Sequence, residues 1–288
     1  MTENAGPEHA GPEHAGSTGD GPVLADRAAE VAWSRALWDV VSAEHAGHLG
    51  RERWAQDELR WGLFGIPESR LRALGDRQPL DLAGLDVLEL GAGPAYVGAH
   101  LVRAGARVTA LDLSGAQLAV AAAARTAHDV PLALLQADAE ALPLAASSFD
   151  LVVTEHGVGA WCDPARWLPE AARVLRPGGR LVMLTTSPLV AWCVPADGGP
   201  AGTTLLRGPA DVARVRWPGG GVEFHPSHAA WVSSFARHGF VVEALHELPG
   251  THPMDAEGSH GYDDYYAIAE PAWAARWPVE DLWVARRR

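Results

Sequence analysis

The sequence predicts an α/β fold with a seven-stranded, mostly parallel sheet, an antiparallel last strand and helices on both faces. Three observations predict it. Short apolar runs alternate with helical patterns between residues 85 and 186, and such alternation favours a parallel sheet covered by helices. A glycine-rich turn at residues 91–98 follows the first apolar run. Near the C-terminus, an insertion separates two further strand patterns, which is the arrangement expected when the last strand runs antiparallel to its neighbours.

Composition is compatible with one large core or two modest ones, because the chain has 288 residues of which 48% are hydrophobic. No run of about 18 apolar residues occurs, so we expect no membrane span. The first residues, Met1 to Asn4, lack the basic and apolar regions of a secretory signal. With only two cysteines and no sign of a disulfide framework, the expected location is the reducing cytoplasm.

Charge argues against nucleic acid as a partner. The formal net charge is −13 at pH 7, and every basic residue outside the histidines is an arginine. An acidic protein repels a polyphosphate backbone. A local basic groove is the alternative that charge alone leaves open.

Residues 1–22 repeat the segment Ala-Gly-Pro-Glu-His and continue into Gly, Ser, Thr and Pro. This composition offers little apolar surface to bury, so we expect a disordered tail. His9 and His14 in this tail are an alternative, weak metal-binding pair.

Residues 23–80 are expected to form a helical N-terminal cap region. Apolar residues recur at near-helical spacing between Asp26 and about Trp61, which predicts one or two helices. A short helix is predicted after Ile66, through Leu71 and Leu74. We expect the region to lie across the ligand edge of the sheet, and the alternative is that it only packs on the sheet.

Residues 81–288 are expected to form the main domain, with insertions at about 187–221 and 249–278. The helix that begins at Pro164 has an N-cap in Asp163 and a proline at its first position, and residues 176–179 form its stop. The predicted strands are Val87–Leu90, Arg107–Leu111, Leu132–Gln136, Phe149–Thr154, Arg180–Thr186, Phe240–Leu248 and Val279–Arg286. The predicted helices are Val97–Ala104, Gly115–Ala127, a short one before Phe149, Pro164–Leu175 and about Ser227–His238.

The glycine turn predicts a nucleoside site. A strand, a glycine turn and a helix bring backbone N–H groups and a helix N-terminus close to a ligand. About twenty residues later, a second apolar run ends at Asp112. An acid at the end of the neighbouring parallel strand can accept hydrogen bonds from both hydroxyls of a ribose. A dehydrogenase would have a glycine at position 96, where this chain has Tyr96.

Four motifs in order resemble the class I S-adenosylmethionine-dependent methyltransferases, most closely the subgroup that includes the quinone-ring methyltransferases. The turn Glu89-x-Gly91-x-Gly93 is similar to the first motif of that family, and Asp112 to its ribose-binding acid. Residues 138–143 resemble the segment that holds adenine, and residues 175–181 the turn before the fifth strand. The resemblance covers residues 80–186 and continues to the C-terminus through the strand pattern.

The resemblance implies a Rossmann-like fold that binds S-adenosylmethionine and releases S-adenosylhomocysteine. The implied cofactor residues come from the ends of the first four strands and the segments after them. An unobstructed backbone in the glycine turn would approach the methionine part. Each of three residues has an alternative role. Asp138 could cap a following helix, Leu113 could pack in the core, and Gln117 could be an exposed surface residue. The expected cofactor residues are Glu89, Gly91, Ala92, Gly93, Asp112, Leu113, Gln117, Asp138, Ala139 and Glu155.

His156 is the candidate general base. It follows the fourth strand, at the sheet edge where open α/β folds bind ligands, and the unperturbed pKa of histidine is about 6.5. The alternative is that Glu155 and His156 only shape the cofactor pocket. Trp161 could line the acceptor site or cover the next helix. Other candidate bases, each more typical of surface or packing positions, are His45, His48, His225 and His228.

A polar-aromatic cluster lies in the last insertion, at Tyr262, Asp263, Asp264, Tyr265 and Tyr266. It could close over the acceptor or mediate self-association as a homodimer. No Cys/His spacing predicts a metal site, and Cys162 and Cys193 are expected to be ordinary thiols.

The expected function is transfer of a methyl group from S-adenosylmethionine to a small organic acceptor, at oxygen. Carbon or nitrogen methylation is the first alternative. A non-catalytic scaffold that binds the cofactor is the second, and a dehydrogenase that binds NAD(H) is the third. The segment after the fourth strand lacks the Asn/Asp-Pro-Pro-Tyr pattern of enzymes that methylate nucleic-acid bases.

Overall fold

The computed structural model describes residues 27–41, 52–195, 199–216, 221–250, 269 and 271–288. Its centre is a seven-stranded sheet with the order β10-β11-β7-β6-β3-β4-β5. β3, β4, β5, β6 and β7 run parallel, while β11 is antiparallel to both β7 and β10. The predicted Rossmann-like fold class is therefore confirmed, including the antiparallel last strand. The strands are β3 (Asp86–Leu90), β4 (Arg107–Asp112), β5 (Ala133–Gln136), β6 (Phe149–Glu155), β7 (Leu175–Thr186), β10 (Phe240–Pro249) and β11 (Pro278–Arg287).

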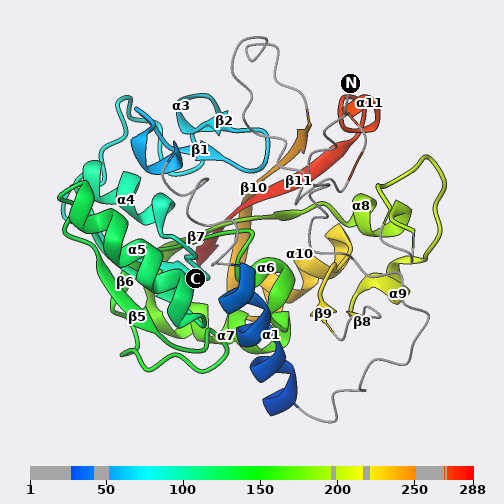
Figure 1. Cartoon of the computed structure of the whole chain (residues 1–288), viewed down its shortest axis with the longest axis horizontal. Helices are drawn as coiled ribbons and strands as arrows, with labels where there is room; N and C mark the ends of the chain where they lie inside the picture. The colour runs from blue at the N-terminus through cyan, green and yellow to red at the C-terminus, as the bar shows by residue number, and fades with distance from the viewer. Residues whose placement is uncertain (1–26, 42–51, 196–198, 217–220, 251–268, 270) are drawn as a thin grey trace, which may run out of the picture.

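Helices cover both faces of this sheet (Figure 1). α4 and α5 contribute Leu101 and Ala121 to one hydrophobic core, while α7 and α10 contribute Trp167 and Phe235 to the other. β11 supplies both cores, because its consecutive side chains alternate between the two faces. The helices are α1 (Arg27–Val41), α3 (Glu68–Leu71), α4 (Tyr96–Arg103), α5 (Gly115–Ala127), α6 (Val158–Trp161), α7 (Pro164–Val174), α8 (Pro188–Cys193), α9 (Pro209–Val212), α10 (His228–Arg237) and α11 (Pro271–Ala274).

The region before the sheet differs from the all-helical prediction. After α1, the chain forms a hairpin of β1 (Arg60–Trp61) and β2 (Ile66–Pro67). Gly62 and Gly65 adopt positive φ in the turn of this hairpin, and buried Trp61 donates from Nε1 to Glu68 at 2.6 Å. The turn glycines and the buried Trp61 therefore favour a hairpin in a segment whose apolar residues have near-helical spacing. The tail at residues 1–22 lies outside the described residues.

Two further predictions need correction. Residues 137–148 form turns, so the short helix predicted between β5 and β6 is absent from this described segment. β7 begins at Leu175 instead of Arg180, because the backbone pairs with β6 at Leu175 and again after a register shift at Arg180. Within the insertion expected at 187–221, the described residues form α8, α9 and β8 (Val215–Arg216), which pairs with β9 (Val222–Glu223). Most of the insertion at 249–278 lies outside the described residues.

The ends of β3 and β6 approach each other closely. A Cβ on Gly157 would lie 2.7 Å from the carbonyl oxygens of both Leu90 and Gly91. A Cβ on Gly91, whose φ is +63°, would lie 2.8 Å from the Cα of Gly157. Only glycine fits at either position without displacing backbone. This contact sets the separation of the two loops at the sheet edge.

A buried acid in β3 holds the start of α4. Glu89 is 3% exposed, and its Oε2 accepts from the backbone N–H of Gly98 at 2.9 Å. Gly98 must be small here, because a Cβ would lie 2.5 Å from that oxygen. Burial raises the pKa of Glu89 well above its usual value, and the nearby charges of Glu155 and Asp112 raise it further.

We predict that Gly157→Ala destabilises the protein by about 1–3 kcal/mol, the usual cost of inserting a methyl group into a packed site. Gly75→Ala is the matched control, because nothing lies within 4 Å of the position of its Cβ. The control should change the free energy of unfolding by less than about 0.5 kcal/mol. Urea unfolding followed by circular dichroism measures both. Equal effects of the two substitutions would contradict the close backbone contact.

We also predict that Glu89→Gln makes stability less dependent on pH. The folded pKa of Glu89 lies above the unfolded value of 4.5, so the folded state binds the proton more tightly. Wild-type stability should therefore fall as pH rises from 4.5 through the raised pKa. Glutamine keeps an acceptor for Gly98 but does not titrate. In thermal unfolding from pH 5 to pH 8, the melting temperature of the variant should rise relative to that of the wild type as pH rises. The same pH dependence of melting temperature in both proteins would refute the prediction.

Candidate functional site

A cavity of about 200 Å³ lies at the carboxyl ends of β3, β4 and β6. The glycine turn after β3 forms one wall, and the segment after β6 forms another. Most of the residues expected at the site contribute to its lining. They are Gly91, Ala92, Gly93, Asp112, Leu113, Gln117, Asp138, Ala139, Glu155 and His156.

The glycine turn presents backbone to the cavity. Gly91 and Gly93 adopt φ of +63° and +52°, which a residue with a side chain rarely adopts. The N–H of Ala92 donates to the carbonyl of Leu111 at 2.9 Å and so ties the end of β3 to the end of β4. A ligand can therefore approach the main chain of this turn closely.

Asp112 is held rigidly beside the turn. Its Oδ2 accepts from the N–H of Gly93 at 2.7 Å, and its Oδ1 accepts from the N–H of Ser114 at 2.8 Å. Burial raises the pKa of Asp112, while these backbone hydrogen bonds oppose the shift. Ser114 in turn caps α5 by accepting from the N–H of Gln117 at 3.1 Å. The carboxylate thus keeps a fixed direction on the cavity wall, where a ligand hydroxyl can donate to it.

Gln117 offers an acceptor to a ligand. The residue is 5% exposed, and its Oε1 has no hydrogen-bond partner within the described part of the chain. This oxygen lies 3.6 Å from the position that a Cβ on Gly93 would take, so it stands beside the glycine turn. A buried acceptor without a partner costs free energy. A ligand with an N–H donor would supply the missing hydrogen bond.

Asp138 already has two partners. Its Oδ1 accepts from the N–H of Glu140 at 2.8 Å, and its Oδ2 forms an ion pair with Arg27. Arg27 also donates from Nε to Glu140 at 2.8 Å. The residues directly after Asp138 form a turn instead of a helix, so the alternative role as a helix cap does not apply. Asp138 and the buried Ala139 line the cavity on the side where α1 crosses it.

α1 covers this side of the cavity, where Figure 1 shows it beside α6. Ser34 and Trp38 of α1 are part of the lining. Trp38 meets the ring of Trp161 edge-on, with 5.0 Å between centroids. Asp39 accepts from the hydroxyl of Ser114, at the start of α5. Arg27 and Asp39 therefore attach the helix to two different walls of the cavity.

Glu155 and Arg53 form a buried ion pair at the opposite end of the lining. Glu155 Oε1 accepts from the N–H of Gly62 at 2.7 Å and lies 3.3 Å from Arg53 Nη1. Arg53 also donates to the hydroxyl of Tyr96 at 3.0 Å and stacks over its ring. Burial raises the pKa of Glu155, and Arg53 opposes the shift. Sequence reasoning missed Arg53, because no local motif marks it.

His156 is oriented by a carboxylate from the last strand. Its Nε2 hydrogen-bonds Glu280 Oε1, and Glu280 is completely buried. The same oxygen accepts from the N–H of Leu63 at 2.9 Å. The φ of His156 is +48°, a conformation that few residues with side chains adopt. A carboxylate only accepts, so this contact favours the tautomer with the ring proton on Nε2.

Other expected residues lie away from the cavity. Glu89 is not part of the lining and instead bonds Gly98 behind the turn. His225 pairs with Glu223 at 2.8 Å, and His228 pairs with Asp281 at 2.7 Å. His45, His48 and the cluster at residues 262–266 lie outside the described residues.

The two cysteines are free thiols. Cys162 lines the cavity, and burial raises its pKa well above the usual value, which makes it a poor nucleophile. Cys193 belongs to a separate core around α8 and α11. Of the helices among the described residues, none is both long and apolar enough to cross a membrane.

Known proteins are similar to the part of the chain that contains the glycine turn and Asp112. Residues 88–183 match the family described as methyltransferase domain. A malonyl-acyl-carrier-protein O-methyltransferase of Pseudescherichia vulneris is 40% identical over 160 residues, which are 55% of this chain and 53% of that protein. A demethylmenaquinone methyltransferase of Clavibacter sepedonicus is 38% identical over 112 residues, 39% of this chain and 45% of that protein. The chain thus spans about half the length of these curated relatives.

A solved structure supports the same assignment over a longer span. The crystal structure of an S-adenosylmethionine-dependent methyltransferase from Mesorhizobium loti superposes with a TM-score of 0.57 and 26% identity. The match covers 78% of this chain and 100% of that one. Sheet order, glycine turn, buried Asp112 and these matches agree: residues 88–183 match a methyltransferase domain, and the α/β fold around them is that of the class I S-adenosylmethionine-dependent methyltransferases, whose cofactor is S-adenosylmethionine.

Proposed function

We propose that the protein transfers a methyl group from S-adenosylmethionine to a small organic acceptor, at oxygen. The observation that carries the proposal is that one cavity has both the glycine turn with Asp112 and the His156–Glu280 pair. The first set suits an adenosyl ligand, and the second suits removal of a proton. The resemblance to the quinone-ring subgroup is compatible with a small acceptor.

The residues that would hold the donor fit its three parts. Asp112 would accept from the ribose hydroxyls, and Asp138 and Ala139 lie where the adenine would bind. The backbone of Gly91 to Gly93 and the orphan oxygen of Gln117 would meet the methionine part, whose ammonium is an N–H donor. Leu113 would pack on the adenosine. When bound, S-adenosylmethionine supplies a methyl group already activated by a sulfonium, so the protein needs mainly to align the reactants.

His156 would accept the proton of the acceptor hydroxyl at Nδ1. Its Nε2–H stays bonded to Glu280, and the negative charge of that carboxylate stabilises the imidazolium that forms. Glu155 keeps a different role, because its Oε1 is engaged by Gly62 and Arg53. We assign it to shaping the pocket floor.

Apolar and aromatic side chains in the cavity lining favour an acceptor with apolar or aromatic surface. Trp38, Trp161, Leu63 and Tyr96 contribute to this lining. One relative is named for O-methyl transfer and another for methylation of demethylmenaquinone. Both names are compatible with transfer to an organic acceptor other than nucleic acid, and the net charge of −13 opposes a nucleic acid.

Three further expectations belong to this proposal. Residues 23–80 would form a cap over the ligand edge, as the contacts of α1 with the cavity walls support. The two free thiols are compatible with a cytoplasmic location. Homodimerisation rests on the sequence of the last insertion alone, and light scattering tests it.

We predict that Asp112→Asn weakens binding of S-adenosylhomocysteine about 10- to 100-fold, because a hydrogen bond to a charged group contributes about 1.5–3 kcal/mol. Calorimetric titration measures the dissociation constants. Asp129→Asn, an exposed position before β5, is the control and should bind like the wild type. NADH should not bind. Binding of NADH without binding of S-adenosylhomocysteine at millimolar concentration would overturn the assignment of the donor.

We predict that His156→Asn lowers the turnover number about 100- to 10,000-fold, the usual contribution of a general base, with unchanged affinity for S-adenosylhomocysteine. Asparagine is chosen because it tolerates positive φ. A labelled methyl donor and pools of metabolites, read by mass spectrometry, would first identify the acceptor. Unchanged turnover of His156→Asn would exclude the base and favour carbon or nitrogen methylation. Absence of S-adenosylhomocysteine formation with every pool would favour the non-catalytic scaffold.

A further inference from the structure

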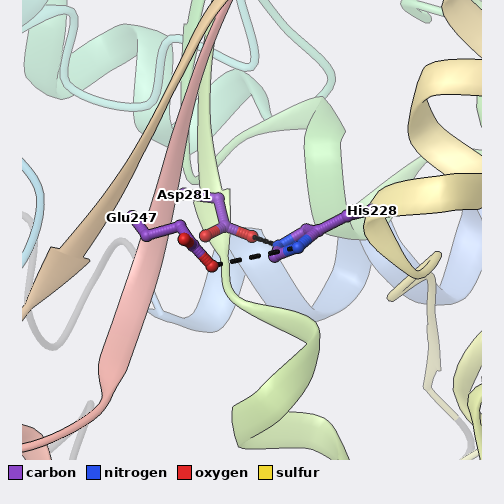
Figure 2. A group of neighbouring side chains, drawn as sticks. All are labelled: His228, Glu247 and Asp281. Atoms are coloured by element: carbon purple, nitrogen blue, oxygen red, sulfur yellow. Dashed lines mark hydrogen bonds and ion pairs between the residues drawn. The ribbon is translucent and has the colours of Figure 1, made fainter.

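A second cluster of polar side chains lies outside the cofactor cavity. His228 begins α10, Glu247 comes from β10 and Asp281 from β11 (Figure 2). His228 Nε2 lies 2.7 Å from Asp281 Oδ2, and His228 Nδ1 lies 3.9 Å from Glu247 Oε1. One ligand atom from each residue lies within 4.8 Å of the other two. None of the three lines the cavity described above.

The fold itself brings the two carboxylates together. Glu247 and Asp281 are directly opposite each other in the β10–β11 ladder, so their side chains share one face of the sheet. Like charges in this position destabilise a strand pair. Within the described residues the ion-pair partner of both carboxylates is His228, which is charged only when protonated. A bound divalent cation would offset the two negative charges without a proton on His228.

Asp281 has an unused ligand atom. Its side chain is completely buried, and within the described residues its Oδ1 has no hydrogen-bond partner. Burial raises the pKa of Asp281 to about 6, and the hydrogen bond from His228 opposes the shift. The neighbouring carboxylate of Glu280 is also completely buried, on the opposite face of β11. Two buried carboxylates in succession leave a negative potential that favours a bound cation.

We propose that His228, Glu247 and Asp281 bind a divalent first-row transition metal ion. One imidazole nitrogen and two carboxylates are a ligand set that suits zinc or manganese, whereas magnesium and calcium prefer oxygen ligands alone. The ion replaces the proton between Nε2 and Oδ2, and these atoms separate slightly to reach metal-ligand distances. Glu247, whose side chain is 54% exposed, rotates onto the ion, and water completes the coordination.

The ion would act as a clamp at one end of the sheet. It joins β10, β11 and the first turn of α10. Because Asp281 and Glu280 are adjacent on β11, the clamp also fixes the strand that supports His156. The three ligands lie outside the cofactor cavity, so the proposal does not depend on the identity of the acceptor.

The test is a metal titration of the full chain after treatment with EDTA. Zinc binding is measured by calorimetry, and cobalt binding by its visible absorption. Glu247→Gln is the main variant, because an exposed side chain can be changed without affecting the fold. Glu243→Gln is the matched control, since it makes the same change on the same strand at a glutamate paired with arginines. Asp281→Asn and His228→Asn complete the set.

We expect one zinc equivalent in the wild type that Glu247→Gln weakens at least about 10-fold, that Asp281→Asn abolishes and that Glu243→Gln leaves unchanged. Zinc should raise the melting temperature of the wild type and of Glu243→Gln, but not that of Asp281→Asn. Absence of zinc and cobalt binding would overturn the proposal. Equal binding by the wild type, Glu247→Gln and His228→Asn would also overturn it, because the metal would then bind at other histidines.

Discussion

The close backbone contact between Gly91 and Gly157 is the constraint on which the rest of the site depends. It brings the loop after β3 against the loop after β6 without an intervening side chain. The glycine turn and the segment with His156 therefore share one cavity. The hydrogen bond from Ala92 to Leu111 extends the same fixation to β4, where Asp112 lies. Main-chain contacts thus hold the ends of β3, β4 and β6 at fixed separations. These separations set the positions from which the side chains of the site extend.

Around this frame the protein concentrates buried acids. Glu89, Asp112 and Glu155 all have raised pKa values, because burial penalises their charged forms. Each is satisfied in part by backbone N–H groups from a glycine: Gly98, Gly93 and Gly62 respectively. A Cβ on Gly98 would lie 2.5 Å from the carboxylate oxygen of Glu89, and Gly62 and Gly93 adopt positive φ, which favours glycine. The site thus costs folding free energy, which the two apolar cores on either face of the sheet offset.

Local patterns predicted most of the sheet and the glycine-turn wall of the cavity. Strands, α5 and the cap of α7 followed from periodicity and from Asp163 and Pro164, because these signals act within a few residues. The hairpin at β1 and β2 was missed, since Gly62 and Gly65 punctuate a segment whose apolar spacing resembles a helix. Arg53 and Glu280 were missed for another reason. They reach the site from about 100 residues away along the chain, and no short-range pattern records such pairings.

The metal-binding proposal shows the same limit. His228, Glu247 and Asp281 are dispersed over three elements, so a search for ligand spacing along the chain fails, and only the β10–β11 register brings them together.

The pairing of His156 with Glu280 joins the segment that matches the methyltransferase family to the last strand of the sheet. The segment that matches the methyltransferase family ends at residue 183 and holds the parts that would recognise the donor. The carboxylate that orients His156 lies beyond it, and Arg53 and Leu63 lie before it. Similarity confined to the matching segment therefore leaves out part of the cavity. His156 lies inside that segment, but the carboxylate that orients it and several residues of the cavity wall come from the sequence on either side.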